Sequence, residues 1–178
     1  GRLGAEHLMS CGLRSLAFYG DDEPHNPNHD RRIGFEQCIA THRGVERLDL
    51  VPTDHYVDLA TPVSPDLLEW LNHCPRPIGF MAQTDQAALH LHLACRMAGL
   101  RIPEDAAIVS VHNDQLKCQL VHPAISSIEL GLERLGYRAA QLIDRMADGQ
   151  TIPPQVIAFP PVCVVARGST DRQFVNDP

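Results

Sequence analysis

The chain contains no run of 18 consecutive apolar residues, and it has little positive charge. Its 15 Lys and Arg stand against 22 Asp and Glu, which gives a formal net charge of −7. The missing apolar run excludes a membrane-spanning helix within these residues, because a helix needs about 20 such residues to cross a bilayer. The shortage of Lys and Arg argues against nucleic-acid binding by this chain as a whole, since phosphate contacts need clustered positive charge.

The sequence also lacks the spacings that hold metals or form disulfide frameworks. No two of the six cysteines form a CxxC pair, and the ten histidines show no zinc-like spacing. Scattered single cysteines are typical of reduced thiols in a cytoplasmic protein. We therefore expect no disulfide framework, no metal and no cofactor.

Motifs for nucleotide binding and covalent catalysis are missing as well. There is no GxGxxG, no GxxxxGK[ST] and no GxSxG. These absences argue against a dinucleotide site, a phosphate-binding loop and a nucleophile elbow, and we expect that the chain is not an enzyme. A small α/β enzyme stays open as an alternative, with Arg31, Asp85 and His112 as an acid–base cluster in a crevice.

What the sequence has is an alternation of strand-like and helix-like segments, with 44% hydrophobic residues to form a core. Apolar runs predict strands at 15–20, 47–54, 77–82, 106–111 and 162–168. Helical periodicity predicts helices at 3–11, 31–44, 86–98 and 132–148, and Ser64-Pro65-Asp66 begins another, with Ser64 as the N-cap. Repeated β–α–β units predict an α/β fold, a parallel sheet with helices on both faces.

Four of the predicted strands end in polar side chains. The stretch "IGFMAQTDQ" ends at Thr84 and Asp85, and "AAIVSVHND" ends at His112, Asn113 and Asp114. The other two ends are Tyr19, Asp21 and Asp22 for the first strand, and Asp54, His55 and Tyr56 for the second. The carboxyl ends of parallel strands share one edge of a sheet, where ligands bind. This mixture of donors and acceptors with tyrosine nearby suits a neutral polyhydroxyl compound.

A purely structural role stays open for each of these polar residues. Asp85 could serve only as the N-cap of the next helix. Asn113 and Asp114 could close a turn, and Asp21 and Asp22 could lie in a loop.

Longer segments resemble the effector domain of lactose-repressor-like (LacI/GalR) transcription regulators. They are "RRIGFEQCI", "PIGFMAQTDQAALHLHLACRMAGLRIPEDAAIVSVHND" and "AISSIELGLERLGYRAAQLIDRM". The stretch "PPVCVVARGSTDRQFVNDP" is similar, more particularly, to xylose operon regulators, which carry an AraC-type DNA-binding domain after this sensor fold.

The resemblance implies a type I periplasmic-binding-protein fold, in which a sugar binds between two α/β lobes. Residues 1–174 would be a partial effector-binding domain, and residues 15–129 would form the core of the C-terminal lobe. Residues 1–14 and 130–165 would belong to the incomplete other lobe, and 169–178 would be a linker toward a DNA-binding domain outside this chain. Apolar helix faces without their sheet favour association, so we expect a homodimer.

The resemblance also implies the residues that bind the effector, a pentose such as xylose. They are Arg31, Tyr56, Thr84, Asp85, His112 and Asn113. His112 stands where the family usually has a sugar-binding Asp, which leaves the identity of the sugar open. A periplasmic-type sugar carrier of the same fold is the alternative function, and the choice between activator and repressor also stays open.

Overall fold

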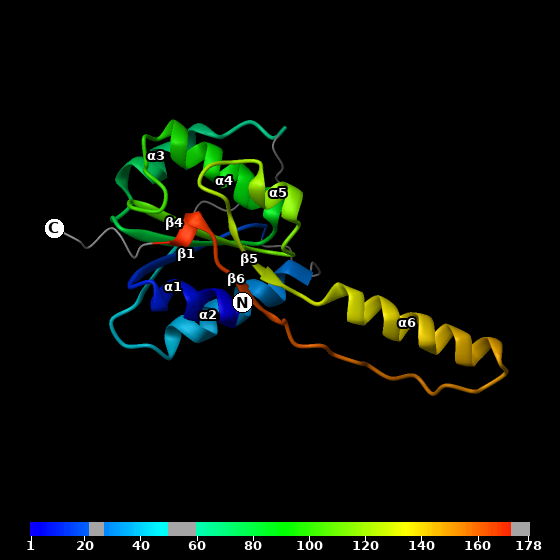
Figure 1. Cartoon of the computed structure of the whole chain (residues 1–178). Helices are drawn as coiled ribbons and strands as arrows, with labels where there is room; N and C mark the ends of the chain where they lie inside the picture. The colour runs from blue at the N-terminus through cyan, green and yellow to red at the C-terminus, as the bar shows by residue number, and fades with distance from the viewer. Residues whose placement is uncertain (22–26, 50–59, 172–178) are drawn as a thin grey trace.

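The computed structural model describes residues 1–21, 27–49 and 60–171 of the 178 residues. These residues form one six-stranded sheet in the order β2-β1-β3-β4-β5-β6 (Figure 1). The strands are β1 (Ser15–Tyr19), β2 (Glu46–Leu48), β3 (Ile78–Ala82), β4 (Ala106–Val111), β5 (Ser126–Glu129) and β6 (Cys163–Val165). Strands β1 to β5 pair in parallel, and β6 pairs antiparallel with β5 at the edge.

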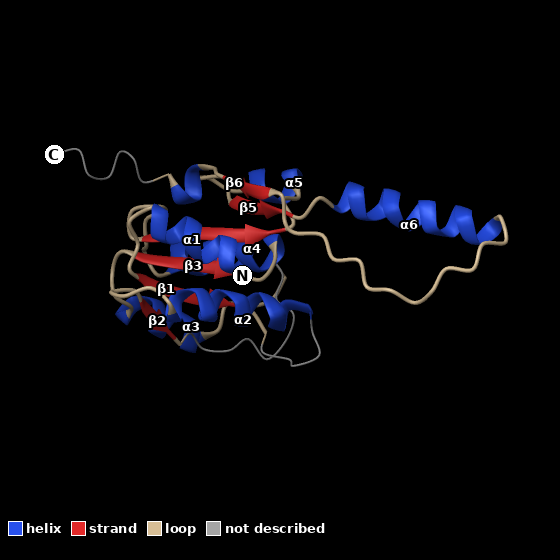
Figure 2. Cartoon of the chain, turned by 90° about the horizontal axis from the view of Figure 1, so that it is seen from below, coloured by secondary structure: helices blue, strands red, loops and turns tan. Residues whose placement is uncertain are grey.

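Helices cover both faces of this sheet, as the sequence predicted. One face carries α1 (Arg2–Ser10) and α2 (Pro27–Ala40). The other carries α3 (Pro65–His73), α4 (Asp85–Met97) and the short α5 (Gln115–Gln119) (Figures 1 and 2). The fold class, an α/β fold with helices on both faces of a mainly parallel sheet, is confirmed.

The two central strands show why the sheet sits inside the molecule. Every residue of β3 and β4 is buried. Because side chains alternate along a strand, Phe80 and Ile108 enter the core beneath α3 and α4. Met81 and Val109 enter the second core, beneath α1 and α2. Burying each of these large side chains stabilises the fold by roughly 1.5–3 kcal/mol.

The helix that follows residue 64 begins where its sequence predicted. Ser64 Oγ accepts a hydrogen bond from the Leu67 backbone N–H at 3.2 Å, and Pro65 occupies the first turn. The serine cap satisfies one of the backbone donors that a helix leaves open at its start.

The N-terminal helix corrects one prediction. Ala5 and Leu8 of α1 are fully buried and share the second core with Phe35 of α2 and Met81 of β3. Gly4 packs so closely on Met81 that a Cβ there would overlap the Met81 sulfur. The assignment of residues 1–14 to another lobe is therefore wrong, since α1 packs on the same sheet as α2.

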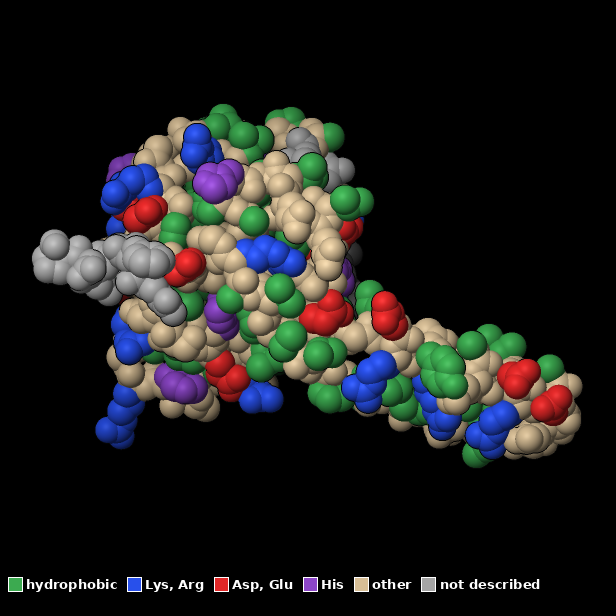
Figure 3. All heavy atoms as spheres, viewed as in Figure 1, with side chains coloured by type: hydrophobic (Ala, Val, Ile, Leu, Met, Phe, Trp, Pro, Cys, Tyr) green, Lys and Arg blue, Asp and Glu red, His purple; other side chains and the backbone are tan. Residues whose placement is uncertain are grey.

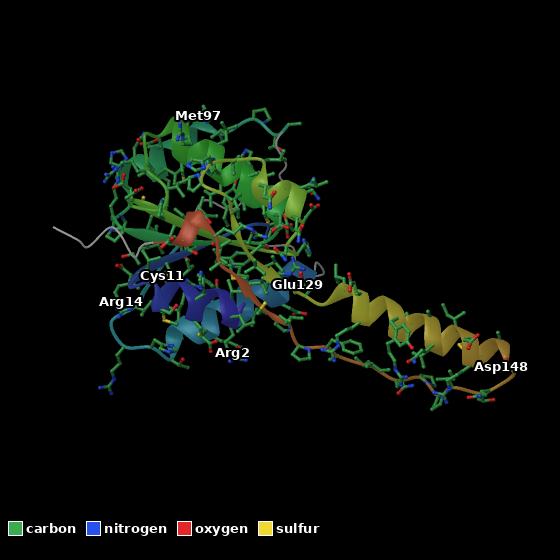
Figure 4. All side chains as sticks on the ribbon, in the orientation of Figure 1. Arg2, Cys11, Arg14, Met97, Glu129 and Asp148 are labelled. Carbon is green, nitrogen blue, oxygen red and sulfur yellow. The ribbon has the colours of Figure 1, made fainter. Side chains whose placement is uncertain are left out.

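Helix α6 (Leu132–Ala147) leaves the sheet after β5, and the chain returns from it to β6 (Figures 1 and 2). We call residues 130–162 the arm. Figure 4 shows Glu129 at its base and Asp148 near its far end. No residue of α6 is buried, and hydrophobic side chains lie along the arm among charged ones (Figure 3). Its large exposed apolar residues are Leu132, Leu135, Tyr137, Ile143, Met146, Val156 and Val162. The assignment of these residues to a second lobe stays a prediction, while β6 belongs to the sheet described above.

Three elements of the described part of the chain were not predicted, namely β5, α5 and the short 3-10 helix η1 (Gly168–Thr170). Strand β2 ends at Leu48, short of the predicted range 47–54, and residues 50–59 lie outside the described part of the chain. The six cysteines all lie in the described residues, and none of them forms a disulfide bond there. None of the described helices combines the length and the apolarity that a bilayer-crossing helix needs.

Candidate functional site

The candidate site lies at the carboxyl ends of the parallel strands. Strand β1 leads into Gly20 and Asp21, β3 into Gln83 and Thr84, and β4 into His112. Between β1 and β3 the chain switches sides, because α2 and α4 cover opposite faces. Such a switch point opens a crevice between neighbouring strand ends. We call this edge of the sheet the rim.

Arg31 of α2 spans the ends of two strands at the rim. Its Nη1 donates a hydrogen bond to the Gln83 carbonyl oxygen at 2.6 Å. Its Nη2 lies 3.0 Å from His112 Nε2. A guanidinium group can only donate, so Nε2 must be the acceptor and the His112 proton must sit on Nδ1. Burial and the neighbouring Arg31 charge lower the pKa of His112, which favours the same neutral form.

Asp85 is the centre of a buried hydrogen-bond network beside Arg31. One of its carboxylate oxygens accepts from Ser110 Oγ at 2.5 Å and from Ser127 Oγ at 2.6 Å. The other oxygen accepts from the Asp114 backbone N–H at 2.7 Å. The side chain lies in the first turn of α4, where the helix dipole favours a negative charge. Asp85 thus ties α4 to β4, to β5 and to the loop that follows β4.

The two residues after β4 have an uncommon backbone conformation. His112 has a φ of 107° and Asn113 a φ of 56°, values that residues with a side chain rarely adopt. The His112 N–H donates to the Ile128 carbonyl at 3.0 Å, and the Asn113 N–H donates to Ser127 Oγ at 2.9 Å. These bonds hold a strained turn in place, and strain of this kind gathers at functional sites.

Asn113 uses both ends of its side-chain amide within the protein. Its Nδ2 donates to Glu129 at 2.9 Å, and its Oδ1 accepts from Arg167 Nη2 at 2.7 Å. The amide therefore joins the turn after β4 to the end of β5 and to the segment after β6.

Gln83 is a rim residue that the sequence analysis quoted but did not select. Its side chain is fully buried, and its Oε1 accepts from the Asp21 N–H at 2.9 Å. Gly20 allows this approach, because a Cβ there would overlap the Gln83 amide. Among the described residues no partner receives the Gln83 Nε2 hydrogens. A buried amide donor without a partner costs about 1–3 kcal/mol, so this amide is a further candidate for contact with a ligand or water. Its place as the first polar residue of "QTDQ" was the signal.

A family model for a periplasmic binding protein-like domain matches residues 5–170. The chain belongs to this family. Over 97% of its length it is 32% identical to the "Xylose operon regulatory protein" of Escherichia coli (strain K12). The chain spans 44% of that relative's length, so the relative has more than twice as many residues.

Solved structures agree with this membership. The structure of a xylose-binding transcription activator superposes on 99% of the chain with a TM-score of 0.79 and 30% identity, and the chain covers 47% of it. A periplasmic binding protein/LacI transcriptional regulator from Alkaliphilus metalliredigens QYMF, complexed with D-xylulofuranose, superposes on 94% of the chain with a TM-score of 0.79. The chain covers 61% of that protein at 18% identity, a likeness that shows the fold alone.

In this periplasmic binding protein-like domain, the five predicted site residues that the structure describes lie at the rim. Arg31 contacts His112, and Asp85 binds the backbone of Asp114 directly after Asn113. Thr84 lies beside Asp85, where its Oγ1 accepts from the Ala87 N–H at 3.1 Å and caps α4. The cap of α4 is therefore Thr84 and not Asp85, the residue considered for it from the sequence. Tyr56 lies outside the described residues, and effector contact by all six predicted residues stays a prediction.

Two grooves of the domain lie away from this site. One, of about 580 Å³, runs beside α3 and is lined by Trp70 and Glu69. The other, of about 590 Å³, lies beside Arg101 and Pro103, just before β4, and so at the opposite end of the strands. Neither groove is lined by the rim residues that the sequence predicted.

Proposed function

We propose that the chain is the sugar-sensing part of a bacterial transcription regulator and that its effector is a pentose such as xylose. The observation that carries the proposal is Arg31, held by Gln83 and His112 across the ends of β3 and β4. A guanidinium group presents several donors in a fixed plane and can bind two hydroxyl oxygens at once. The similar regulators named above, of which one is described as xylose-binding, support this effector class.

The arm supports a site that closes around its ligand. It leaves from the carboxyl end of β5, the same edge of the sheet as the rim, and none of its helix is buried. A second lobe that packed on the arm would lie over the rim, so that a sugar could contact both lobes. The sugar would then bind the closed state more tightly than the open state, and this difference in affinity would shift the protein toward the closed state. The shift would control a DNA-binding domain.

We place this regulator in the cytoplasm, as a homodimer that binds DNA through a domain outside these residues. The acidic composition of the chain supports a separate DNA-binding domain, since the net charge is −7. The exposed apolar side chains of the arm support association. A periplasmic-type sugar carrier is the second candidate, and binding of a sugar without any response of DNA binding would favour it.

An enzymatic role has less support from the geometry. The two Asp85 oxygens already accept three hydrogen bonds from the protein, and His112 Nε2 faces the Arg31 guanidinium. A general base needs a lone pair within reach of a substrate proton. We therefore infer that these side chains bind and orient a ligand without converting it.

Isothermal titration calorimetry of the protein with pentoses and hexoses tests the proposal. The Arg31→Ala variant should lose at least about a hundredfold in pentose affinity, because two hydrogen bonds from a charged group contribute roughly 1.5–3 kcal/mol each. The matched control is Arg32→Ala, since Arg32 lies on the same helix and pairs with Glu36 at 2.9 Å. The control should stay within about threefold of the unaltered protein. Equal affinities in both variants would remove Arg31 from the site, and no heat with any sugar would refute the function.

A further inference from the structure

At the rim, the Arg31 guanidinium donates hydrogen bonds to a backbone carbonyl and to a lone pair of His112 Nε2. Asp85 is the nearby negative charge, but its oxygens point to Ser110, Ser127 and the Asp114 backbone. The described hydrogen bonds of the guanidinium go to the Gln83 carbonyl and to His112 Nε2. The carbonyl belongs to the backbone and cannot change its charge, whereas the imidazole can.

We propose that His112 is the positioning residue for Arg31 and that it makes effector binding sensitive to pH. The proposal rests on the proposed function, in that Arg31 is taken as the residue that binds the effector. Neutral His112 accepts a hydrogen bond from Arg31 Nη2 at 3.0 Å. Protonated His112 carries a hydrogen on Nε2 and a second positive charge at the same distance. Repulsion between two cations then replaces the hydrogen bond and disfavours this orientation of the guanidinium.

The charged groups around His112 set the direction of this effect. Arg31 faces it from α2 and Lys117 from α5, and both disfavour a further positive charge, while Asp85 of α4 favours one. Lys117 is itself paired with Asp114 at 2.9 Å. Burial and the two cations prevail, so the pKa of His112 is lowered from its ordinary value near 6.5.

The sign of the pH dependence follows from this lowered pKa. The form that binds the effector has a neutral His112, so affinity is full at neutral pH. Below the pKa of His112 each further pH unit should reduce affinity by up to about tenfold, the limit for one linked proton. The fall should therefore lie on the acid side of about pH 6.5.

The backbone of His112 supports a dedicated role. Its φ of 107° is costly for any residue with a side chain, and Gly would be the natural choice there. An imidazole kept in this conformation, with its ring against Arg31, indicates that the side chain is needed where it is.

Two variants of His112 distinguish its role in positioning Arg31 from the effect of its protonation. In His112→Gln an amide oxygen can accept from Arg31 and its NH₂ can donate in place of Nδ1–H, but the group does not titrate. His112→Leu removes the acceptor altogether. Affinity for D-xylose is measured by calorimetry between pH 4.5 and pH 8, with circular dichroism to confirm that each protein stays folded.

We expect the unaltered protein to bind more weakly at pH 4.5 than at pH 8, by up to about tenfold for each pH unit below the pKa of His112. His112→Gln should keep its affinity within about threefold across the range, and His112→Leu should bind weakly at every pH. A flat profile for the unaltered protein, or an equal acid loss in His112→Gln, would overturn the proposal.

Nitrogen NMR of the His112 imidazole tests its pairing with Arg31 in the absence of a ligand. We expect an unprotonated Nε2 at neutral pH, and in Arg31→Met a pKa that rises toward the ordinary value. A proton on Nε2, or a pKa unchanged in Arg31→Met, would refute the role of His112. If no sugar binds while these NMR results hold, the proposed function fails and the Arg31–His112 pairing stands.

Discussion

Replacing Asp85 by Ala should destabilise the protein far more than the loss of an exposed carboxylate in the first turn of a helix does. Asp85 is 2% exposed and accepts hydrogen bonds from Ser110, Ser127 and the Asp114 backbone at 2.5–2.7 Å. Removal of the carboxylate takes the acceptor from two buried hydroxyl groups and from one half-buried backbone N–H. Each unpaired donor costs about 1–3 kcal/mol, and the two hydroxyl groups can rotate toward other acceptors, so we expect a loss of about 3–5 kcal/mol in the free energy of unfolding.

Asp66 provides the matched control for this measurement. It also lies in the first turn of its helix, α3, but its side chain is exposed. Both substitutions remove a favourable interaction with the helix dipole, of about 0.3–1 kcal/mol, so the difference between them isolates the buried hydrogen bonds of Asp85. Urea denaturation at neutral pH gives both free energies. An Asp85→Ala variant within about 1 kcal/mol of Asp66→Ala would show that the network contributes little.

Three further predictions concern other parts of the molecule. In urea denaturation, His112→Gly should be more stable than His112→Ala by about 1 kcal/mol, because glycine tolerates the φ of 107° at this position better than alanine does. In most positions alanine is the more stable of the two. An Ala variant at least as stable as the Gly variant would show that the backbone here is not strained. Ser169 is fully buried and joins the backbones of β4 and β5, so Ser169→Ala should lower the melting temperature by several degrees, from a loss of about 2 kcal/mol. Exposed Ser10→Ala should change it by about a degree or less. Leu135→Glu with Ile143→Glu should reduce association of this chain in light scattering, because both side chains are exposed on α6. A monomer before substitution would count against association through the arm.

The central strands were predictable because their signal is local. Strands β3 and β4 are continuous apolar runs that end in polar residues, and both faces of each are buried. Strand β5, by contrast, begins with Ser126 and Ser127, which are fully buried. Their hydroxyl groups are satisfied by Asp85 and by the segment around Thr170, which lie 42 and 44 positions away. A local sequence pattern therefore could not predict β5, because its polar side chains depend on partners that are distant in sequence.

The arm shows the other limit of sequence patterns. The apolar stripe of residues 132–148 correctly predicted a helix, α6. The same kind of stripe predicted the helix α1, but the family resemblance placed that helix in the other lobe, whereas α1 packs on the sheet described above. Periodicity tells which face of a helix is apolar, but it does not tell which surface that face meets.

The candidate site was predictable as a set of strand ends but not as a set of contacts. Parallel pairing alone brings Thr84 and His112 to one edge. The Arg31–His112 contact joins residues 81 positions apart, and it depends on the path of α2 over the sheet and on the strained turn after β4. The buried amide of Gln83 had one signal, its place as the first polar residue after β3, but the sequence did not show that this side chain is buried.

The contacts at the rim divide into those that fix the backbone and those that would face the proposed effector. Asp85 and Ser127 hold the N–H groups of Asp114 and Asn113, and so fix the turn that carries His112. His112 in turn orients Arg31.

Loss of Asp85 should therefore weaken effector binding although its oxygens face the protein. Loss of Arg31 should weaken binding at a cost of less than about 1 kcal/mol in stability. If Asp85 acts on the proposed effector only through the turn, the effects of Asp85→Asn and His112→Leu on affinity should not add. The double variant should then bind about as weakly as His112→Leu alone. Additive losses would mean that Asp85 meets the effector directly.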